Sequence, residues 1–157
     1  MNTVKEPIVR KAIVKDVLVI ADIVNYHAKM GVMLPRPISR IYDNVRDYMV
    51  IESNGDILGC GALHVMWSDL AEILALALRD EYIGKGYGRP IVEYLLEEAK
   101  NLGIEKVFVL TYKADFFKHF GFSVIDKSEL PHKIWSECVN CMHFPNCEEV
   151  ALIRSVK

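Results

Sequence analysis

The segment best suited to hold a ligand is the glycine-rich run Gly84-Lys85-Gly86-Tyr87-Gly88. It follows a nearly all-apolar run of strand length, Glu72 to Leu78, and leads into a segment with helical periodicity from about Arg89. Glycines between a strand and a helix leave backbone N–H groups bare at the helix N-terminus, where a phosphate is favoured. No Gly-Lys-Ser/Thr triplet follows, and a Rossmann fingerprint would need a glycine where Arg89 stands. The loop therefore predicts a phosphate-bearing ligand that is not a dinucleotide.

A second group of chemically capable residues lies near the C-terminus, in the pattern Cys138-x-x-Cys141-x-His143-x-x-x-Cys147. Three thiolates and one imidazole would complete a tetrahedral structural zinc site, and His132 is an alternative to His143. Against zinc, the segment lacks a second paired knuckle, and buried cysteine often packs as a small hydrophobe. We keep zinc as a hypothesis, in which the metal would brace the fold and take no part in catalysis.

The composition of the chain argues against a nucleic-acid or membrane partner and favours a small-molecule ligand. The chain has 157 residues, 52% of them hydrophobic and 25% charged, which fits one globular domain over residues 1–157. Its net charge is −2 and its basic residues are scattered, so no nucleic-acid-binding face is expected. No apolar stretch approaches bilayer length, and Met1 to Lys11 lacks the pattern of an export signal. We expect a cytoplasmic protein that acts on a small molecule away from membranes; whether it forms a homodimer stays open.

The elements that must position these residues follow from periodicity and turn signals. The Gly-loop helix joins two apolar strands in a βαβ unit, and an Asn-Gly step predicts a hairpin between the second and third strands. Asp16 is expected to cap the first helix. The predicted strands are Val9–Ile13, Tyr48–Glu52, Ile57–Met66, Glu72–Leu78, Lys106–Thr111, Phe122–Ile125 and Val150–Ser155, and the predicted helices are Val17 to about Met30, Ser39–Val45, Arg89 to Gly103 and Lys113–Phe120.

Leu76-Ala77-Leu78 followed by Tyr82-Ile83-Gly84-Lys85-Gly86-Tyr87-Gly88 resembles the coenzyme A motif of the GNAT N-acetyltransferase superfamily. That family's pattern, Gln/Arg-x-x-Gly-x-Gly/Ala, falls on Ile83, Gly86 and Gly88, so Ile83 departs from it. The resemblance implies an α/β (α+β) fold with a mixed, mainly antiparallel central sheet of about six to seven strands and about four helices. It also implies acetyl-CoA as co-substrate, bound by Leu76, Ala77, Leu78, Ile83, Gly84, Lys85, Gly86, Tyr87, Gly88 and Arg89.

A narrower likeness is to the acetyltransferase domain of N-acetylglutamate synthases. It rests on Val107–Thr111, Phe116–Phe122, Leu130-Pro131, Gly31–Arg36 and Gly59–Leu63. It implies acetyl transfer to the α-amine of a small amino acid, above all L-glutamate, in arginine biosynthesis. Three alternatives stay open: another amine (a polyamine, an antibiotic or a protein amine), a non-catalytic coenzyme A sensor, and a zinc-stabilised interaction module.

The resemblance also assigns roles at the reacting centre. Glu72 matches an acidic residue that acts as base through a water, and backbone amides near Ala75 and Leu76 would hold the oxyanion, because family members splay this strand from the next. The usual general acid, a tyrosine, is replaced here by Phe117. Tyr112 or a water held by Thr111 is expected instead, unless the thiol needs no acid.

For the acceptor, Arg36 between Pro35 and Pro37 matches an arginine of the synthases, and Lys113 is the second candidate for a carboxylate. The synthases' C-terminal substrate contacts do not carry over to Asn146–Glu149. Cys60 is expected in the core, and His27, His64 and His119 are interpreted as structural.

Overall fold

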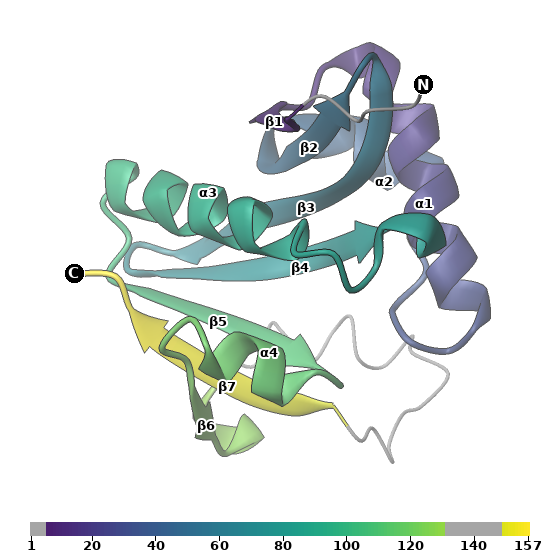
Figure 1. The fold of residues 1–157 in the computed structure, drawn as a ribbon. Helices are drawn as coiled ribbons and strands as arrows, with labels where there is room; N and C mark the ends of the chain where they lie inside the picture. Colours follow the sequence, from purple (N-terminus) through teal and green to yellow (C-terminus); the bar gives the residue numbers. More distant parts are fainter. Residues whose placement is uncertain (1–5, 131–148) are drawn as a thin grey trace.

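The fold is built on a seven-stranded sheet, seen in a computed structural model that describes residues 6–130 and 149–157 (Figure 1). The strand order is β1-β2-β3-β4-β5-β7-β6, and every neighbouring pair is antiparallel except β4 and β5. The strands are β1 (Ile8–Lys11), β2 (Tyr48–Ser53), β3 (Asp56–Trp67), β4 (Leu70–Leu78), β5 (Lys106–Thr111), β6 (Ser123–Ile125) and β7 (Val150–Ser155). The described α-helices are α1 (Val17–Lys29), α2 (Ile38–Asp43), α3 (Gly88–Asn101) and α4 (Ala114–Lys118), with short 3₁₀ helices η1 (Val14–Asp16), η2 (Val45–Asp47), η3 (Asp80–Tyr82) and η4 (Lys127–Glu129). The predicted mixed, mainly antiparallel sheet with about four helices is confirmed.

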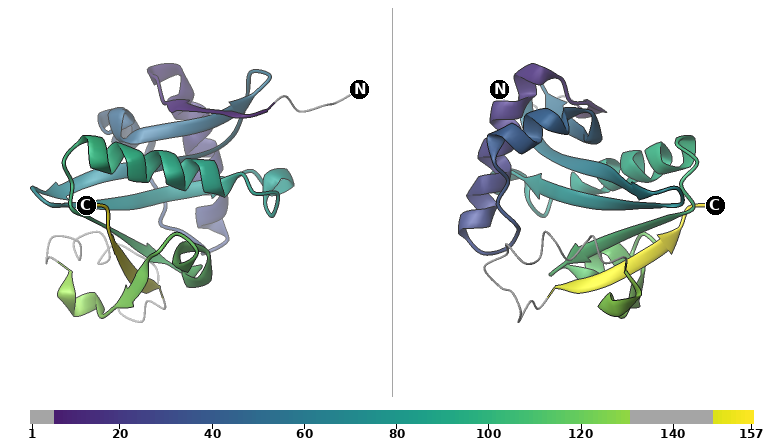
Figure 2. Two further views of the ribbon diagram at one scale, coloured as in Figure 1. Left: turned by 60° about the vertical axis from the view of Figure 1, so that its left-hand side comes forward. Right: turned by 180° about the vertical axis from the view of Figure 1, so that it is seen from behind.

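Helices cover the sheet on both faces. One core lies between the sheet and α3 with α4, and a second lies between the sheet and α1 with α2 (Figures 1 and 2). The predicted apolar face of α3 is buried: Ile91, Val92, Leu95, Leu96 and Ala99. In the described ranges no helix is both long and apolar enough to cross a bilayer.

Most predicted boundaries lie within two residues of the observed ones, the usual uncertainty at element ends. The β2–β3 hairpin turns at Asn54 and Gly55, with φ of 56° and 84°, as the Asn-Gly step predicts. The predicted helix over Ser39–Val45 is instead α2, which ends at Asp43, followed by η2. The predicted helix over Lys113–Phe120 shortens to α4.

The central strand β4 separates from β5 soon after pairing with it. The parallel ladder joins Leu70–Glu72 to Lys106–Phe108 only, and the two strands then diverge (Figure 1). β5 stays paired with β7 along its whole length, from Lys106 to Thr111. The segment of β4 from Ile73 to Leu78 therefore lacks β5 as a hydrogen-bonding neighbour.

A bulge accompanies the separation. On the β3 side, Cys60 lies opposite Ala77 and Ala62 lies opposite Leu74, so β4 carries one extra residue. Ala75 adopts φ of 55°, a left-handed conformation that costs a non-glycine residue about 1–2 kcal/mol. The bulge reverses the alternation of side chains: Leu74 and Ala75 both pack on the α1 side, whereas Ile73 and Leu76 pack on the α3 side.

The predicted capping role of Asp16 is wrong. Its carboxylate makes no capping bond to α1 and instead pairs with the Arg10 guanidinium, Oδ2–Nη1 2.8 Å and Oδ1–Nη2 3.1 Å. It also accepts the Ile13 backbone N–H at 2.8 Å. The Arg10 hydrogen bonds, the largest effect, hold the pKa of Asp16 below its usual value although burial opposes them. Asp16 thus fastens β1 to the start of α1.

Asp16→Asn tests this interaction. Loss of the charge should lower the free energy of unfolding by about 2 kcal/mol at neutral pH, the scale of a charged hydrogen-bonded pair. Because the folded-state pKa is depressed, the Asp16 contribution is present above the unfolded-state pKa of about 3.9 and is lost as pH falls through the lower folded value. In urea unfolding, the difference in free energy of unfolding between the native protein and the variant should therefore become smaller as the pH is lowered. Asp22→Asn, which removes an exposed carboxylate on α1, is the control.

Candidate active site

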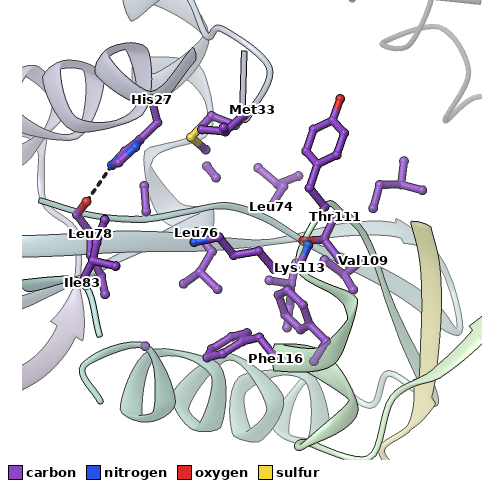
Figure 3. Close-up of a pocket in the computed structure, with 18 of the residues that line it drawn as sticks. His27, Met33, Leu74, Leu76, Leu78, Ile83, Val109, Thr111, Lys113 and Phe116 are labelled. Carbon is purple, nitrogen blue, oxygen red and sulfur yellow. Dashed lines mark hydrogen bonds between the residues drawn. The ribbon is translucent and has the colours of Figure 1, made fainter. Parts of the chain in front are cut away.

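A cleft of about 620 Å³ opens where β4 and β5 diverge (Figure 3). Its walls come from β4, β5, the glycine loop and the start of α3, α4 with the residues just after it, and the end of α1 with the loop that leads to α2. This volume is in the range of small-molecule sites, and the lining is mainly apolar with a few charged side chains. All the residues predicted for catalysis, cofactor and substrate line this cleft except Lys85.

The glycine loop forms one end of the cleft. Gly84 and Gly86 have φ of 81° and 84°, and both line it. Gly88 has another function, since an added Cβ would lie 3.1 Å from the Phe116 ring, so its smallness lets α3 pack against α4. No side chain of the described residues caps α3, which leaves its first-turn amides for a ligand.

The exposed edge of β4 forms one long wall. Leu76 and Leu78 lie along it (Figure 3). His27, from α1, has Nε2 2.7 Å from the Leu78 carbonyl oxygen and is buried. Sequence reasoning interpreted His27 as merely structural, yet it lines the cleft. Its position had a signal, because it continues the helical spacing of Ile20, Ile23 and Val24.

Charged side chains also line the cleft. Glu72 is 8% exposed and lines it together with Arg36, Lys113 and Glu149. The cleft thus brings together the predicted base and both predicted cations. Glu149, which was not predicted as a site residue, adds a second carboxylate.

The residues near the predicted general acid fall into two environments. Phe117 is buried and packs edge-to-face on Phe116 and Phe122, with ring centroids 5.1 and 5.5 Å apart. Thr111 and Tyr112 line the cleft at the end of β5, and Thr111 Oγ1 accepts the Lys113 backbone N–H at 2.9 Å. Phe117 has no proton to donate, so Thr111 and Tyr112 remain the candidates.

Asn25 fixes the position of Arg36. The Arg36 backbone N–H donates to Asn25 Oδ1 at 2.9 Å, and the Arg36 carbonyl accepts from Asn25 Nδ2 at 2.9 Å. Two prolines flank Arg36 and restrict the same backbone. The loop that presents Arg36 is therefore tied to α1 rather than free to move. Sequence reasoning did not identify Asn25.

The cysteines separate into two cases. Cys60 is fully buried, as expected, and burial raises the pKa of its thiol to about 12. The candidate zinc ligands Cys138, Cys141, His143 and Cys147, with the alternative His132, lie outside the described residues. Within residues 6–130 and 149–157, no group of three or more metal-ligating side chains is present.

Comparison with known proteins adds sequence relatives. Residues 25–122 match the model of the acetyltransferase (GNAT) family. An uncharacterized N-acetyltransferase of Chlorobaculum tepidum is 36% identical over 148 residues, which are 94% of this chain and 96% of the relative. An amino-acid acetyltransferase of Mycobacterium tuberculosis is 37% identical over 134 residues, 83% of this chain and 76% of the relative.

Solved structures share the fold. A Mycobacterium tuberculosis protein in complex with CoA and a second ligand matches with a TM-score of 0.80 and 30% identity, over 94% of this chain and 98% of that one. The N-acetylglutamate synthase of Neisseria gonorrhoeae, complexed with coenzyme A and N-acetyl-glutamate, matches with a TM-score of 0.88 over 98% of this chain. At 22% identity and 36% coverage of the synthase, that likeness establishes the fold alone.

Asn25→Ala tests the tie between α1 and the Arg36 loop. Loss of the acceptor for the Arg36 N–H should speed hydrogen exchange of that amide by roughly five- to tenfold, since a net hydrogen bond contributes about 1 kcal/mol. Asn44→Ala is the matched control, because Asn44 Nδ2 bonds the Arg40 carbonyl instead. Equal Arg36 exchange in the native and Asn25→Ala proteins would show that the prolines alone fix the loop.

Proposed function

This chain belongs to the acetyltransferase (GNAT) family, and we propose that it moves the acetyl group of acetyl-CoA to the α-amine of L-glutamate, a step of arginine biosynthesis. The observation that carries the proposal is one cleft lined by a glycine loop, a candidate base and two cations. The amino-acid acetyltransferase of Mycobacterium tuberculosis supports the class of acceptor.

The cofactor would lie along β4. Phosphates would bind the bare amides of the glycine loop and of the first turn of α3, where the helix dipole favours an anion. Beyond Ile73, the edge of β4 that β5 leaves has backbone groups that the amides of the pantetheine arm can pair with. Ile83 is partly exposed at the cleft and contributes only apolar contact where a Gln or Arg would add a hydrogen bond.

The reacting carbonyl would then lie near the bulge. A bulge takes an extra residue out of regular pairing, which supports the assignment of the Ala75 or Leu76 amide as donor to the oxyanion. Glu72, three residues before Ala75, would take the proton of the ammonium group through a water. The departing thiolate would receive a proton from Tyr112 or from a water at Thr111, or leave as the anion.

The acceptor's carboxylates would pair with cations that line the cleft. Arg36 offers a planar fork that matches a carboxylate in two-point geometry, and Lys113 offers a second, compact charge. Two cations suit an acceptor with two carboxylates, such as glutamate.

Gly86→Ala tests the cofactor site, with Gly55→Ala as a matched control. Both glycines have φ of 84° and open space around an added Cβ, so each substitution carries the same backbone cost of about 1 kcal/mol. Only Gly86 lines the cleft. Calorimetry should show a dissociation constant for acetyl-CoA at least tenfold higher in Gly86→Ala and unchanged in Gly55→Ala. Equal affinity in both folded variants would remove the phosphate-binding role of this loop.

Glu72→Gln and Arg36→Ala test the acceptor end, and their effects should separate kinetically. Glu72→Gln keeps the size but loses the base, so kcat should fall about 10²-fold or more with little change in acetyl-CoA affinity. Arg36→Ala should raise KM for glutamate, with kcat/KM reduced by about 2–3 kcal/mol in transition-state terms. Steady-state assays would compare glutamate, glutamine and aspartate. If the native protein acetylates none of them, the glutamate assignment fails while family membership stands.

A further inference from the structure

One carbonyl group on the exposed edge of β4 already has a partner. His27 Nε2 lies 2.7 Å from the Leu78 carbonyl oxygen, and His27 is 9% exposed (Figure 3). A carbonyl oxygen only accepts hydrogen bonds, so Nε2 carries the proton and donates it. The Tyr26 ring packs edge-to-face on the imidazole, with ring centroids 5.2 Å apart. Helix α1 is therefore bonded directly to the last residue of β4.

The pairing of β3 with β4 shows which way the Leu78 carbonyl points. The Arg79 backbone N–H donates to the Leu58 carbonyl of β3 at 2.9 Å. The Leu78 C=O belongs to the same planar trans peptide as this N–H, and the two groups of such a peptide point in opposite directions. The Leu78 carbonyl therefore points away from β3, to the edge that β5 has left. His27 occupies a position on that open edge.

The Leu78 N–H faces the same edge. Opposite residues of an antiparallel ladder alternate between hydrogen-bonded and non-hydrogen-bonded pairs. Gly59 and Leu78 form the non-hydrogen-bonded pair next to Leu58 and Arg79. Pairs of this kind lie closest together, and a Cβ on Gly59 would lie only 2.5 Å from Leu78 Cδ2. Both backbone groups of Leu78 therefore point away from β3.

The Leu76 carbonyl also faces this edge. Ala77 lies opposite Cys60, one step further along the ladder, where the pair is hydrogen-bonded and the Ala77 N–H points to β3. The Leu76 C=O shares a peptide with that N–H and so points the other way. Leu76 and Leu78 both line the cleft. Because His27 takes the Leu78 carbonyl, the stretch from Leu76 to Leu78 presents the Leu76 C=O as acceptor and the Leu78 N–H as donor to a ligand.

We propose that His27 ends the pairing edge of β4 at Leu78 and so fixes the register in which the pantetheine arm of acetyl-CoA lies along this strand; this inference rests on the proposed function. A second acceptor at Leu78 would let the arm pair two residues further along, a shift of roughly 6.6 Å. That shift would carry the thioester away from the bulge at Ala75 and from Glu72. His27 acts through the Leu78 carbonyl and is a positioning residue.

His27→Met and His27→Gln test this role. Glutamine places its amide nitrogen close to the position of Nε2 and keeps the donor, whereas methionine has similar bulk and cannot donate. Two acetyl donors are compared, with the amino acid that the native protein acetylates fastest as acceptor. Acetyl-CoA has phosphates that also bind the glycine loop, whereas S-acetylpantetheine has none and depends on the strand edge alone.

The two donors should respond differently to the loss of the hydrogen bond. In His27→Met, kcat should fall about tenfold with S-acetylpantetheine and no more than about threefold with acetyl-CoA. In His27→Gln, both kcat values should stay within about twofold of the native ones. Thermal unfolding checks that each variant is folded, and His27→Leu replaces His27→Met if the methionine variant is not.

The comparison separates positioning from packing. Equal losses with both donors in His27→Met would overturn the proposal, because His27 would then only support the fold, and equal losses in His27→Gln and His27→Met would overturn it as well. So would a native protein that uses acetyl-CoA but not S-acetylpantetheine, since the strand edge would then fail to position the arm. If the native protein transfers acetyl from acetyl-CoA to no amino acid, the proposed function itself fails.

Discussion

The separation of β4 from β5 is the constraint on which the site depends. A parallel pair that joins only Leu70–Glu72 to Lys106–Phe108 leaves the rest of β4 without β5 as a hydrogen-bonding partner on that edge, and no other described strand takes its place there. Backbone groups on such an edge are costly when kept from water without partners. β5 stays paired with β7 along its whole length, so its backbone keeps a partner on that side where it turns away from β4. The fold thus creates an edge in the middle of its sheet, and a ligand with amide groups can pair with it.

Hydrogen bonds from α1 fix two of the segments that border the cleft. His27 of α1 bonds the carbonyl of Leu78, the last residue of β4, and Asn25, two residues earlier, bonds the backbone of Arg36. One helix therefore contacts both the end of β4 and the loop that carries Arg36. If Arg36 binds the acceptor as we propose, these bonds would hold its backbone in place, and fixed geometry of that kind lowers the barrier to transfer.

Features that depend on interactions between residues close in the sequence were predicted well, whereas features that depend on distant residues were not. Strands, helices and the Asn-Gly turn depend on local signals and were predicted within a few residues, and the glycine loop was identified because glycines between a strand and a helix leave backbone amides open to a phosphate. The separation and the bulge depend on strand register; the separation was expected only through family resemblance, and the bulge was not predicted. One signal was present: a Cβ on Gly59 would lie 2.6 Å from the Ala77 carbonyl, and an isolated strand glycine often marks close approach. Asp16 was mistaken for a cap because its partner, Arg10, lies on a strand six residues earlier.

Position 117 carries phenylalanine where related enzymes carry a tyrosine that protonates the thiolate. Proton removal from the amine is therefore the more demanding proton transfer in this site. Phe117 contributes to a buried aromatic cluster and has no proton to donate. A thiol with a pKa of about 8.5 can leave as the thiolate anion, so the absence of a tyrosine acid has little effect on the departure of coenzyme A. The amine is different, since it must give up two protons as it becomes an amide, and Glu72 is nearly inaccessible to bulk water. A site of this composition therefore depends more on the removal of protons from the amine than on the donation of a proton to the thiolate.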